Sequence, residues 1–180
     1  DLSFAYLKGD GVEEDFDKAM YWLKKSANQG HSIAENDLAV IYSKVETEEG
    51  QELAVYWYEK ASEHGNADAQ ANLGICYARG TGVPKNNEKA VYWWAKASRQ
   101  GHAGAQYRLG ICFKNGTGVD KDVRAAILLN IKSAEQGYAK AQLALGHAYD
   151  DGELIKQDSE KAVYWWAKAA EQGMMEAQYN

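Results

Sequence analysis

Proline, cysteine and long apolar runs are scarce in this sequence. A single proline in 180 residues, with 46% hydrophobic and 26% charged residues, excludes a Pro-rich linker and a disordered chain. The longest apolar runs are about five residues, as at 125–129, which is too short to cross a bilayer. No basic segment followed by an apolar stretch opens the sequence, so we expect no signal peptide within it.

Positive charge is also in deficit. The 26 acidic residues outnumber the 20 basic residues, and the net charge of -6 repels phosphate backbones. We therefore expect no nucleic-acid partner and no membrane insertion. Phenylalanine occurs only three times, whereas tyrosine occurs twelve times and tryptophan six times. This imbalance among the aromatic residues results from internal repetition.

The sequence repeats with a period of about 36 residues. The segment at 89–97 returns at 161–169, two periods later, and a diverged copy at 125–133 lies midway. The predicted array covers residues 1–180, with repeats at 1–30, 31–65, 66–101, 102–137 and 138–173, and a sixth begins at 174–180. Five glycines close the repeats and five alanines follow them at fixed spacing: Gly30, Gly65, Gly101, Gly137 and Gly173, then Ala34, Ala69, Ala105, Ala141 and Ala177.

Each repeat reads as two helices, A and B. In helix A of the third repeat, Ala69, Leu73 and Tyr77 share one apolar face at helical spacing. The glycine after this leucine costs helix propensity, and its recurrence predicts that a neighbouring helix approaches too closely for a Cβ atom. A G-x-G-V link follows helix A, which predicts a left-handed helix terminus and a second positive-φ turn. The recurring helical glycines are Gly74, Gly110 and Gly146.

Helix B has its own boundary signals. An Asp or Asn stands four residues before its first recurring alanine, which predicts an N-cap. A lysine recurs near its end, where a cation complements the helix dipole. Its Trp-Trp pairs are alternatively sugar-binding platforms, but their recurrence in register favours a core between repeats. The caps are Asp15, Asn86, Asp122 and Asp158, and the lysines are Lys25, Lys60, Lys96, Lys132 and Lys168.

A single helix pair cannot bury its own apolar stripe, whereas stacked pairs can. The sequence therefore predicts an all-α fold, a right-handed α/α superhelix (solenoid) of helix-turn-helix repeats. Helix A is cut short at Asp1 and again at Asn180, so we expect the array to continue in the natural protein. Apolar residues at the cut repeat ends would favour end-to-end self-association: Leu2, Phe4, Met174 and Met175.

These residues resemble the Sel-1-like repeat (SLR) family, a relative of the tetratricopeptide repeats. The resemblance implies a superhelical scaffold that binds proteins or peptides, without chemistry of its own. Family members include adaptors in endoplasmic-reticulum quality control and bacterial secreted or periplasmic proteins, which favours a periplasmic or secreted bacterial location. The matching positions in the third repeat are Ala69, Leu73, Gly74, Tyr77, Gly80, Gly82, Val83, Lys89, Ala90, Trp93, Lys96, Ala97 and Gly101.

Three copies depart from the family pattern. The link at 43–50 lacks G-x-G-V and is one residue short. Residues 128–130 read Leu-Leu-Asn in place of the Tyr-Trp-Trp of the third and fifth repeats, and Leu154 replaces the second glycine of the fifth link. We expect local differences at these places within an unchanged fold.

The sequence contains no recognisable catalytic or metal-binding cluster. The four histidines are at least 33 residues apart in sequence and lack metal-ligand spacing, and we interpret them as surface residues. Cys76 and Cys112 occupy equivalent positions in adjacent repeats, too far apart for a disulfide, and are interpreted as buried apolar residues. A cysteine-rich branch of the family has been associated with penicillin-binding and β-lactamase activity, but no S-x-x-K signature occurs. We predict no enzyme activity, catalytic residue, cofactor, metal or disulfide.

The predicted function is an interaction scaffold for a protein or peptide partner. By analogy with tetratricopeptide relatives, the A helices line a concave, partner-binding face, and residues there vary between repeats. The alternative is a carbohydrate- or peptidoglycan-related binding module, or an accessory domain of a cell-wall or β-lactam-related enzyme. The candidate partner-binding residues are Asn36, Asp37, Val40, Asn72, Ile75, Tyr107, Arg108, Ile111, Lys140, Leu143 and His147.

Overall fold

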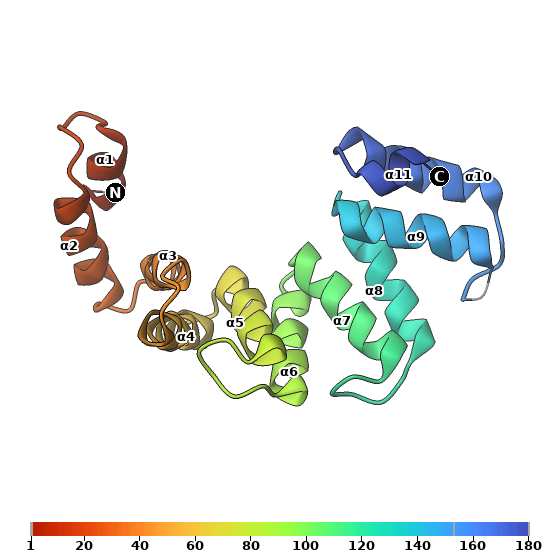
Figure 1. The fold of residues 1–180 in the computed structure, drawn as a ribbon, viewed down its shortest axis with the longest axis horizontal. Coiled ribbons are helices and arrows are strands. Elements are labelled where there is room, and N and C mark those ends of the chain that lie inside the picture. Colours follow the sequence, from red (N-terminus) through yellow and green to blue (C-terminus); the bar gives the residue numbers. More distant parts are fainter. Residues whose placement is uncertain (1, 153, 180) are drawn as a thin grey trace. The chain divides into compact units, whose positions relative to one another are not determined.

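The computed structural model describes residues 2–152 and 154–179, and every regular element in these ranges is a helix (Figure 1). The chain divides into two compact units, residues 1–86 and 87–180, and each is described by itself. The prediction of a single repeat array over residues 1–180 remains a prediction. The first unit holds α1 (Leu2–Lys8), α2 (Phe16–Ala27), α3 (Ser32–Ser43), α4 (Glu48–Glu63) and α5 (Ala67–Arg79). The second holds α6 (Asn87–Arg99), α7 (Ala103–Asn115), α8 (Val123–Glu135), α9 (Ala139–Asp151), α10 (Ser159–Glu171) and α11 (Met175–Tyr179).

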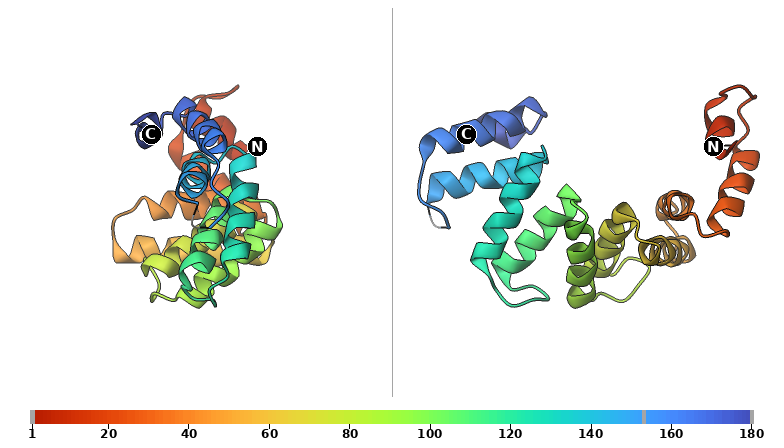
Figure 2. Two further views of the ribbon diagram at one scale, coloured as in Figure 1. Left: turned by 90° about the vertical axis from the view of Figure 1, so that its right-hand side faces the viewer. Right: turned by 180° about the vertical axis from the view of Figure 1, so that it is seen from behind.

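Within each unit, helices that are consecutive in the chain pack side by side, as α9 and α10 do in Figure 2. The odd-numbered helices from α3 to α9 are the predicted A helices, and the even-numbered helices from α2 to α10 are the B helices. This nearest-neighbour packing is the arrangement expected of a helical repeat protein.

The glycines of the G-x-G-V links have the predicted conformations. Gly80, Gly116 and Gly152 end α5, α7 and α9 in the left-handed region. The second glycine also has positive φ, 66° at Gly82 and 69° at Gly118. A Cβ atom on Gly118 would lie 2.5 Å from the carbonyl carbon of Asn87, the first residue of α6. The second glycine therefore lets the link pack directly on the backbone of the preceding B helix.

Three of the four predicted N-caps are confirmed. The side chains of Asp15, Asp122 and Asp158 accept hydrogen bonds from backbone N–H groups three residues later, at 2.9–3.0 Å. At Asp15 and Asp158 these backbone bonds are the main cause that lowers the pKa of the carboxyl group. Asn86 likewise stands directly before its helix, because α6 begins at Asn87.

The short link at 43–50 is closed by residues that the sequence analysis did not identify. Thr47 caps α4 by accepting a hydrogen bond from the Gly50 backbone N–H at 3.1 Å. A Cβ atom on Gly50 would lie 2.7 Å from Cβ of Val45. A threonine cap and a tightly packed glycine thus replace the longer link of the other repeats.

Four of the recurring lysines near the ends of the B helices lie over aromatic rings about one turn earlier: Lys25, Lys60, Lys96 and Lys168. The Nζ atom of Lys25 lies 4.7 Å from the Trp22 ring centroid, and that of Lys96 lies 4.9 Å from the Trp93 centroid. These distances are typical of cation–π contacts. The aromatic rings therefore stabilise the charged lysine side chains, in addition to any contribution from the helix dipole.

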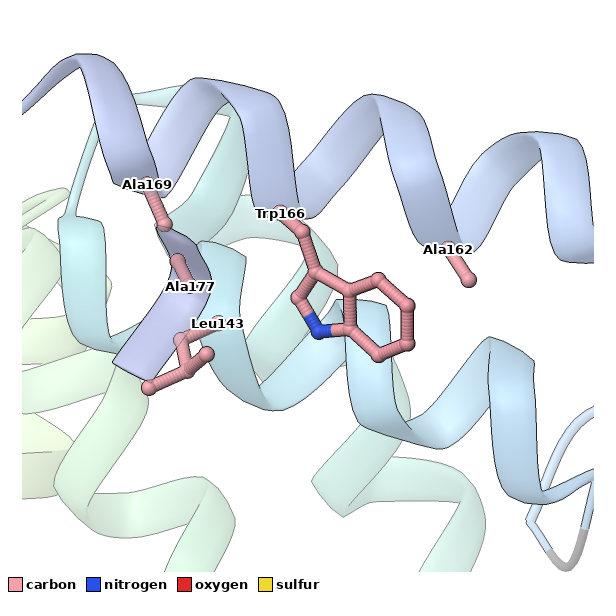
Figure 3. Packing of buried hydrophobic residues seen from close by; sticks show 5 residues of the cluster. All are labelled: Leu143, Ala162, Trp166, Ala169 and Ala177. Carbon is pink, nitrogen blue, oxygen red and sulfur yellow. The ribbon is translucent and has the colours of Figure 1, made fainter. Parts of the chain in front are cut away.

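The Trp-Trp pair of α10 is part of the core between repeats, as predicted. Trp166 is buried against Leu143 of α9 and Ala177 of α11 (Figure 3). Trp165 is half-buried and packs on a cluster that includes Ala134 of α8 and Leu145 of α9. The two rings of one pair thus contact the repeats on either side.

Gly110 and Gly146, two of the three recurring helical glycines, lie where a neighbour approaches closely, as predicted. A Cβ atom on Gly146 would lie 2.5 Å from Nε1 of Trp166. A Cβ atom on Gly110 would lie 3.1 Å from the Ala126 carbonyl oxygen. The first contact is closer than two packed atoms tolerate, so the indole of Trp166 requires a glycine opposite.

In the second unit, a buried glutamine on each A helix pairs with a glutamine at the end of the B helix of the same repeat. Gln136 Nε2 donates to Gln106 Oε1, and Gln172 Nε2 donates to Gln142 Oε1, each at 2.7 Å. The equivalent pair in the first unit is Glu35 and His64, whose Oε2 and Nδ1 atoms are also 2.7 Å apart. Glu35 is only 1% exposed, whereas the His64 side chain is 47% exposed. His64, interpreted from sequence as a surface residue, is thus the partner of a buried carboxyl group.

We expect His64→Ala to lower the free energy of unfolding by about 2–3 kcal/mol, because it leaves the buried Glu35 carboxyl group without this partner. The half-exposed position of His64 keeps the loss below that of a fully buried pair. Gln136→Ala breaks a neutral pair and should cost about 1 kcal/mol. The double variant Glu35→Gln, His64→Gln recreates the pair of the other repeats and should come within about 1 kcal/mol of the parent. Urea denaturation checks these values, and equal losses for His64→Ala and Gln136→Ala would contradict them.

Candidate functional site

The candidate residues of the first unit lie on α3 and α5. Asp37 is exposed, whereas Val40, Asn72 and Ile75 are half-buried. Although the residue is exposed, partial desolvation of the Asp37 carboxyl group raises its pKa, and the charge of Asp68 on the next A helix raises it further. Asn36 is only 9% exposed, so it offers little surface to a partner.

The candidates of the second unit lie on α7 and α9. Ile111, Lys140 and His147 are exposed, and Tyr107 and Arg108 are half-buried. Leu143 is different, because it is only 8% exposed and packs in the core beside Trp166, as Figure 3 shows. Its predicted position on an open face is therefore corrected: α10 and α11 cover this side of α9.

Two adjoining hollows lie beside these residues in the second unit. The first is a cavity of about 260 Å³ between α7, α8 and α9. Tyr107, Ile111 and His147 line it, so three candidates chosen from sequence meet at one place. The second hollow is lined by Tyr107 and Lys140 together with Met174, Met175 and Glu176 from the start of the next repeat. Tyr107 thus stands at the border between the two.

Tyr107 is held in place by its neighbours. Its ring lies 5.5 Å from the Tyr138 ring, and it packs on the cluster around Leu145. Burial raises the pKa of its hydroxyl group, and Tyr138 adds to the shift, while the charge of Arg108 opposes it. At neutral pH the hydroxyl group therefore remains protonated, available to donate a hydrogen bond beside the Arg108 cation.

Asn130 of α8 also lines the cavity and was not among the candidates. Its signal in the sequence was present, because residues 128–130 depart from the aromatic pattern of the other B helices. The departure at 128–130 predicted only a local difference in the fold. It also removes a large side chain from the core, however, and leaves a cavity there.

The exposed candidates of the second unit combine apolar and basic side chains, which suits a binding surface. In residues 2–152 and 154–179, no group of three His, Cys, Asp or Glu side chains is placed to hold a metal ion. His147, the one histidine among the candidates, lies 5.5 Å from the Trp166 ring. No described helix is both long enough and apolar enough to span a bilayer.

The two cysteines are free thiols on A helices, half-buried at Cys76 and buried at Cys112. Burial raises the pKa of Cys76 to about 11 and also raises that of Cys112. The reactive thiolate is therefore scarce at neutral pH.

We expect native Cys76 and Cys112 to react with iodoacetamide at pH 8 at least about 10-fold more slowly than in urea, because a thiol of ordinary pKa is far more ionised at this pH. The rate at Cys76 should rise with pH up to its pKa of about 11. Mass spectrometry of labelled peptides measures each site. A Cys76–Cys112 bridge in the native protein would contradict both the labelling prediction and the predicted absence of a disulfide.

Comparison with known proteins supports the same fold. The Sel1 repeat model matches residues 1–31, 32–66, 67–102, 103–138 and 139–174. A Sel1 repeat protein from Oxalobacter formigenes is 33% identical with a TM-score of 0.87, over 97% of this chain and 70% of that one. No curated protein sequence matches the chain.

Two further structures extend the comparison. A protective antigen present in uropathogenic Escherichia coli strains, which displays an SLR fold, is 34% identical with a TM-score of 0.88. The match covers 98% of this chain but only 38% of the antigen. Cysteine-rich protein B of Helicobacter pylori is 24% identical with a TM-score of 0.56, over 74% of this chain and 96% of that one, which shows the fold alone. The predicted all-α solenoid fold is confirmed, and the chain belongs to the Sel1 repeat family.

Proposed function

We propose that this chain is an interaction scaffold that binds a protein or peptide partner through the A-helix face of its second unit. Sel1 repeat proteins are generally scaffolds for protein interactions, and the family is typically non-catalytic. The observation that carries the proposal is the hollow surface beside α7 and α9. Its lining residues differ from repeat to repeat, whereas the core residues beneath them recur.

The chemistry of this face favours a partner that presents both apolar and acidic groups. Ile111 and the half-buried ring of Tyr107 offer apolar contact. Arg108 and Lys140 supply positive charge, and an Arg guanidinium binds a carboxylate through two parallel hydrogen bonds. Tyr and Arg are also enriched among residues that dominate binding energies.

The carbohydrate alternative requires aromatic rings that are free to stack on sugars. The exposed rings of Tyr92 and Tyr164 each lie 5.0 Å from the next tryptophan, edge to face. Lys96 also lies over Tyr92 at 4.8 Å, and Lys168 lies over Tyr164 at 5.9 Å. Because their faces are already in contact with lysines, we favour the protein-binding function.

We expect the double variant Tyr107→Ala, Arg108→Ala to weaken partner binding by at least about 2 kcal/mol. The partner is first captured on the immobilised parent chain, then purified, and its affinity is measured by isothermal titration calorimetry. Because Tyr107 packs on Tyr138, the double variant should also melt earlier, so Arg108→Ala alone serves as the variant with unchanged packing. Lys96→Ala on α6 is the control and should leave the affinity within about 0.5 kcal/mol. If the parent, the double variant and Arg108→Ala bound the partner with equal affinity, the assigned binding face would be rejected. Binding to a glycan array would support the carbohydrate-binding alternative.

A further inference from the structure

The cavity beside α8 lies where the third and fifth repeats have a tryptophan. Positions 94, 130 and 166 are equivalent, because they are separated by the repeat length of 36 residues. Trp94 and Trp166 are buried at 6% and 8% exposure, but position 130 is an asparagine. In α10 the indole of Trp166 lies against Gly146, and Gly110 is the equivalent glycine opposite α8. The fourth repeat has thus kept the glycine that accommodates an indole and lost the indole itself.

The cavity has the size and lining that a flat ring requires. Gly110 forms one wall, Ala126 and Ile127 another, and Leu145 and Ala148 of α9 a third. The volume of about 260 Å³ compares with about 150 Å³ for an apolar cavity that binds benzene. There is therefore room for a ring larger than benzene.

One polar atom inside the site lacks a partner. Oδ1 of Asn130 is buried and accepts no hydrogen bond from any described residue. A buried acceptor of this kind is destabilising until a donor reaches it. An indole carries one N–H group on an otherwise apolar ring, so it matches both the apolar walls and the single acceptor.

The cavity is accessible from the proposed binding face. Ile111 and Lys114 of α7 and His147 and Asp151 of α9 line it and are exposed. Leu154 also lines it, at the position where the third and fourth links have the glycine that packs on the preceding B helix. A side chain that projects from a bound partner can therefore enter between α7 and α9.

We propose that this cavity binds an indole ring supplied by a tryptophan side chain of the partner, with the indole N–H donating to Oδ1 of Asn130. This inference rests on the proposed function, because it assigns one anchor residue to the partner on that face. The partner's indole takes the place of the tryptophan that the fourth repeat lacks.

The test uses small probes and needs no partner. N-acetyltryptophanamide represents a tryptophan within a chain, and indole and N-methylindole differ in the N–H group. Ligand-observed NMR should give a dissociation constant of about 1 mM or lower for the amide and for indole. N-methylindole should bind at least about 5-fold more weakly, because it leaves the Asn130 acceptor unpaired.

Two variants locate the binding. Asn130→Trp fills the cavity with the chain's own indole and should abolish binding of all three probes, while its melting temperature rises by about 3 °C. Asn130→Ala keeps the cavity but removes the acceptor, so indole and N-methylindole should bind it equally. It keeps the test decisive even if the tryptophan variant does not fold.

Each contrary result overturns a defined part of the inference. No probe binding to the parent, or unchanged binding to a folded Asn130→Trp variant, would reject the site. Equal affinity of the parent for indole and N-methylindole would reject the role of Asn130. Binding of indole but not of the amide would reject a partner side chain as the occupant. If Arg108→Ala weakens partner binding and Asn130→Trp does not, this inference fails while the proposed function stands.

Discussion

Replacing Gly118 with alanine is expected to lower the free energy of unfolding by about 3–4 kcal/mol, although the change adds a single methyl group. Two costs combine here. At φ of 69° an L-residue is disfavoured by about 1–2 kcal/mol. In addition, the new Cβ atom would lie 2.5 Å from the carbonyl carbon and oxygen of Asn87. Because those atoms are backbone at the start of α6, the link must move away from the helix, which costs about 2 kcal/mol more.

Gly137→Ala separates the two costs. Gly137 has φ of 86° and no atom within 4 Å of an added Cβ atom. Its replacement should therefore cost only the conformational part, about 1–2 kcal/mol. Urea denaturation followed by far-UV circular dichroism gives both values. If the two variants were equally destabilised, the close packing of the link on α6 would not contribute to stability.

The sequence alone was sufficient for features that are set by local rules and repeated. Helix boundaries follow from the glycines and acidic caps, because Gly116 and Asp122 act on the backbone within a few residues of themselves. The close approach at Gly146 was also predictable, since a helical glycine that recurs in register has no local benefit. Repetition made each of these signals visible several times.

The remaining features depend on contacts between positions distant in sequence. The Glu35–His64 pair spans 29 residues, and neither residue alone indicates the other. Leu143 is hidden by α10 and α11, which a helical wheel of α9 does not contain. The candidate site was predicted only in part, because Asn130 signals a cavity only when the volume of the missing ring is compared with the walls that remain.

Trp166→Ala is expected to lower the free energy of unfolding by about 3–5 kcal/mol, the usual cost of removing a buried tryptophan. The indole lies between Gly146 and the cluster that contains Leu143 and Ala177 (Figure 3). Since Gly146 has no side chain to move into the space, the site cannot close and an empty cavity remains. Tyr164, two residues earlier on α10, is 53% exposed, so Tyr164→Ala is the control and should cost less than about 1 kcal/mol.

A second step makes this prediction specific to the glycine–indole contact. Gly146→Ala in the parent should lower stability by about 2 kcal/mol, because the methyl group would lie 2.5 Å from Nε1 of Trp166. In the Trp166→Ala background the same change meets no indole, and alanine favours a helix by about 1 kcal/mol over glycine. Gly146→Ala should therefore stabilise the Trp166→Ala variant, although it destabilises the parent. The difference between its effects in the two backgrounds is a coupling energy of about 3 kcal/mol in a double-mutant cycle. Additive effects in that cycle would mean that the glycine is kept for a reason other than the ring it faces.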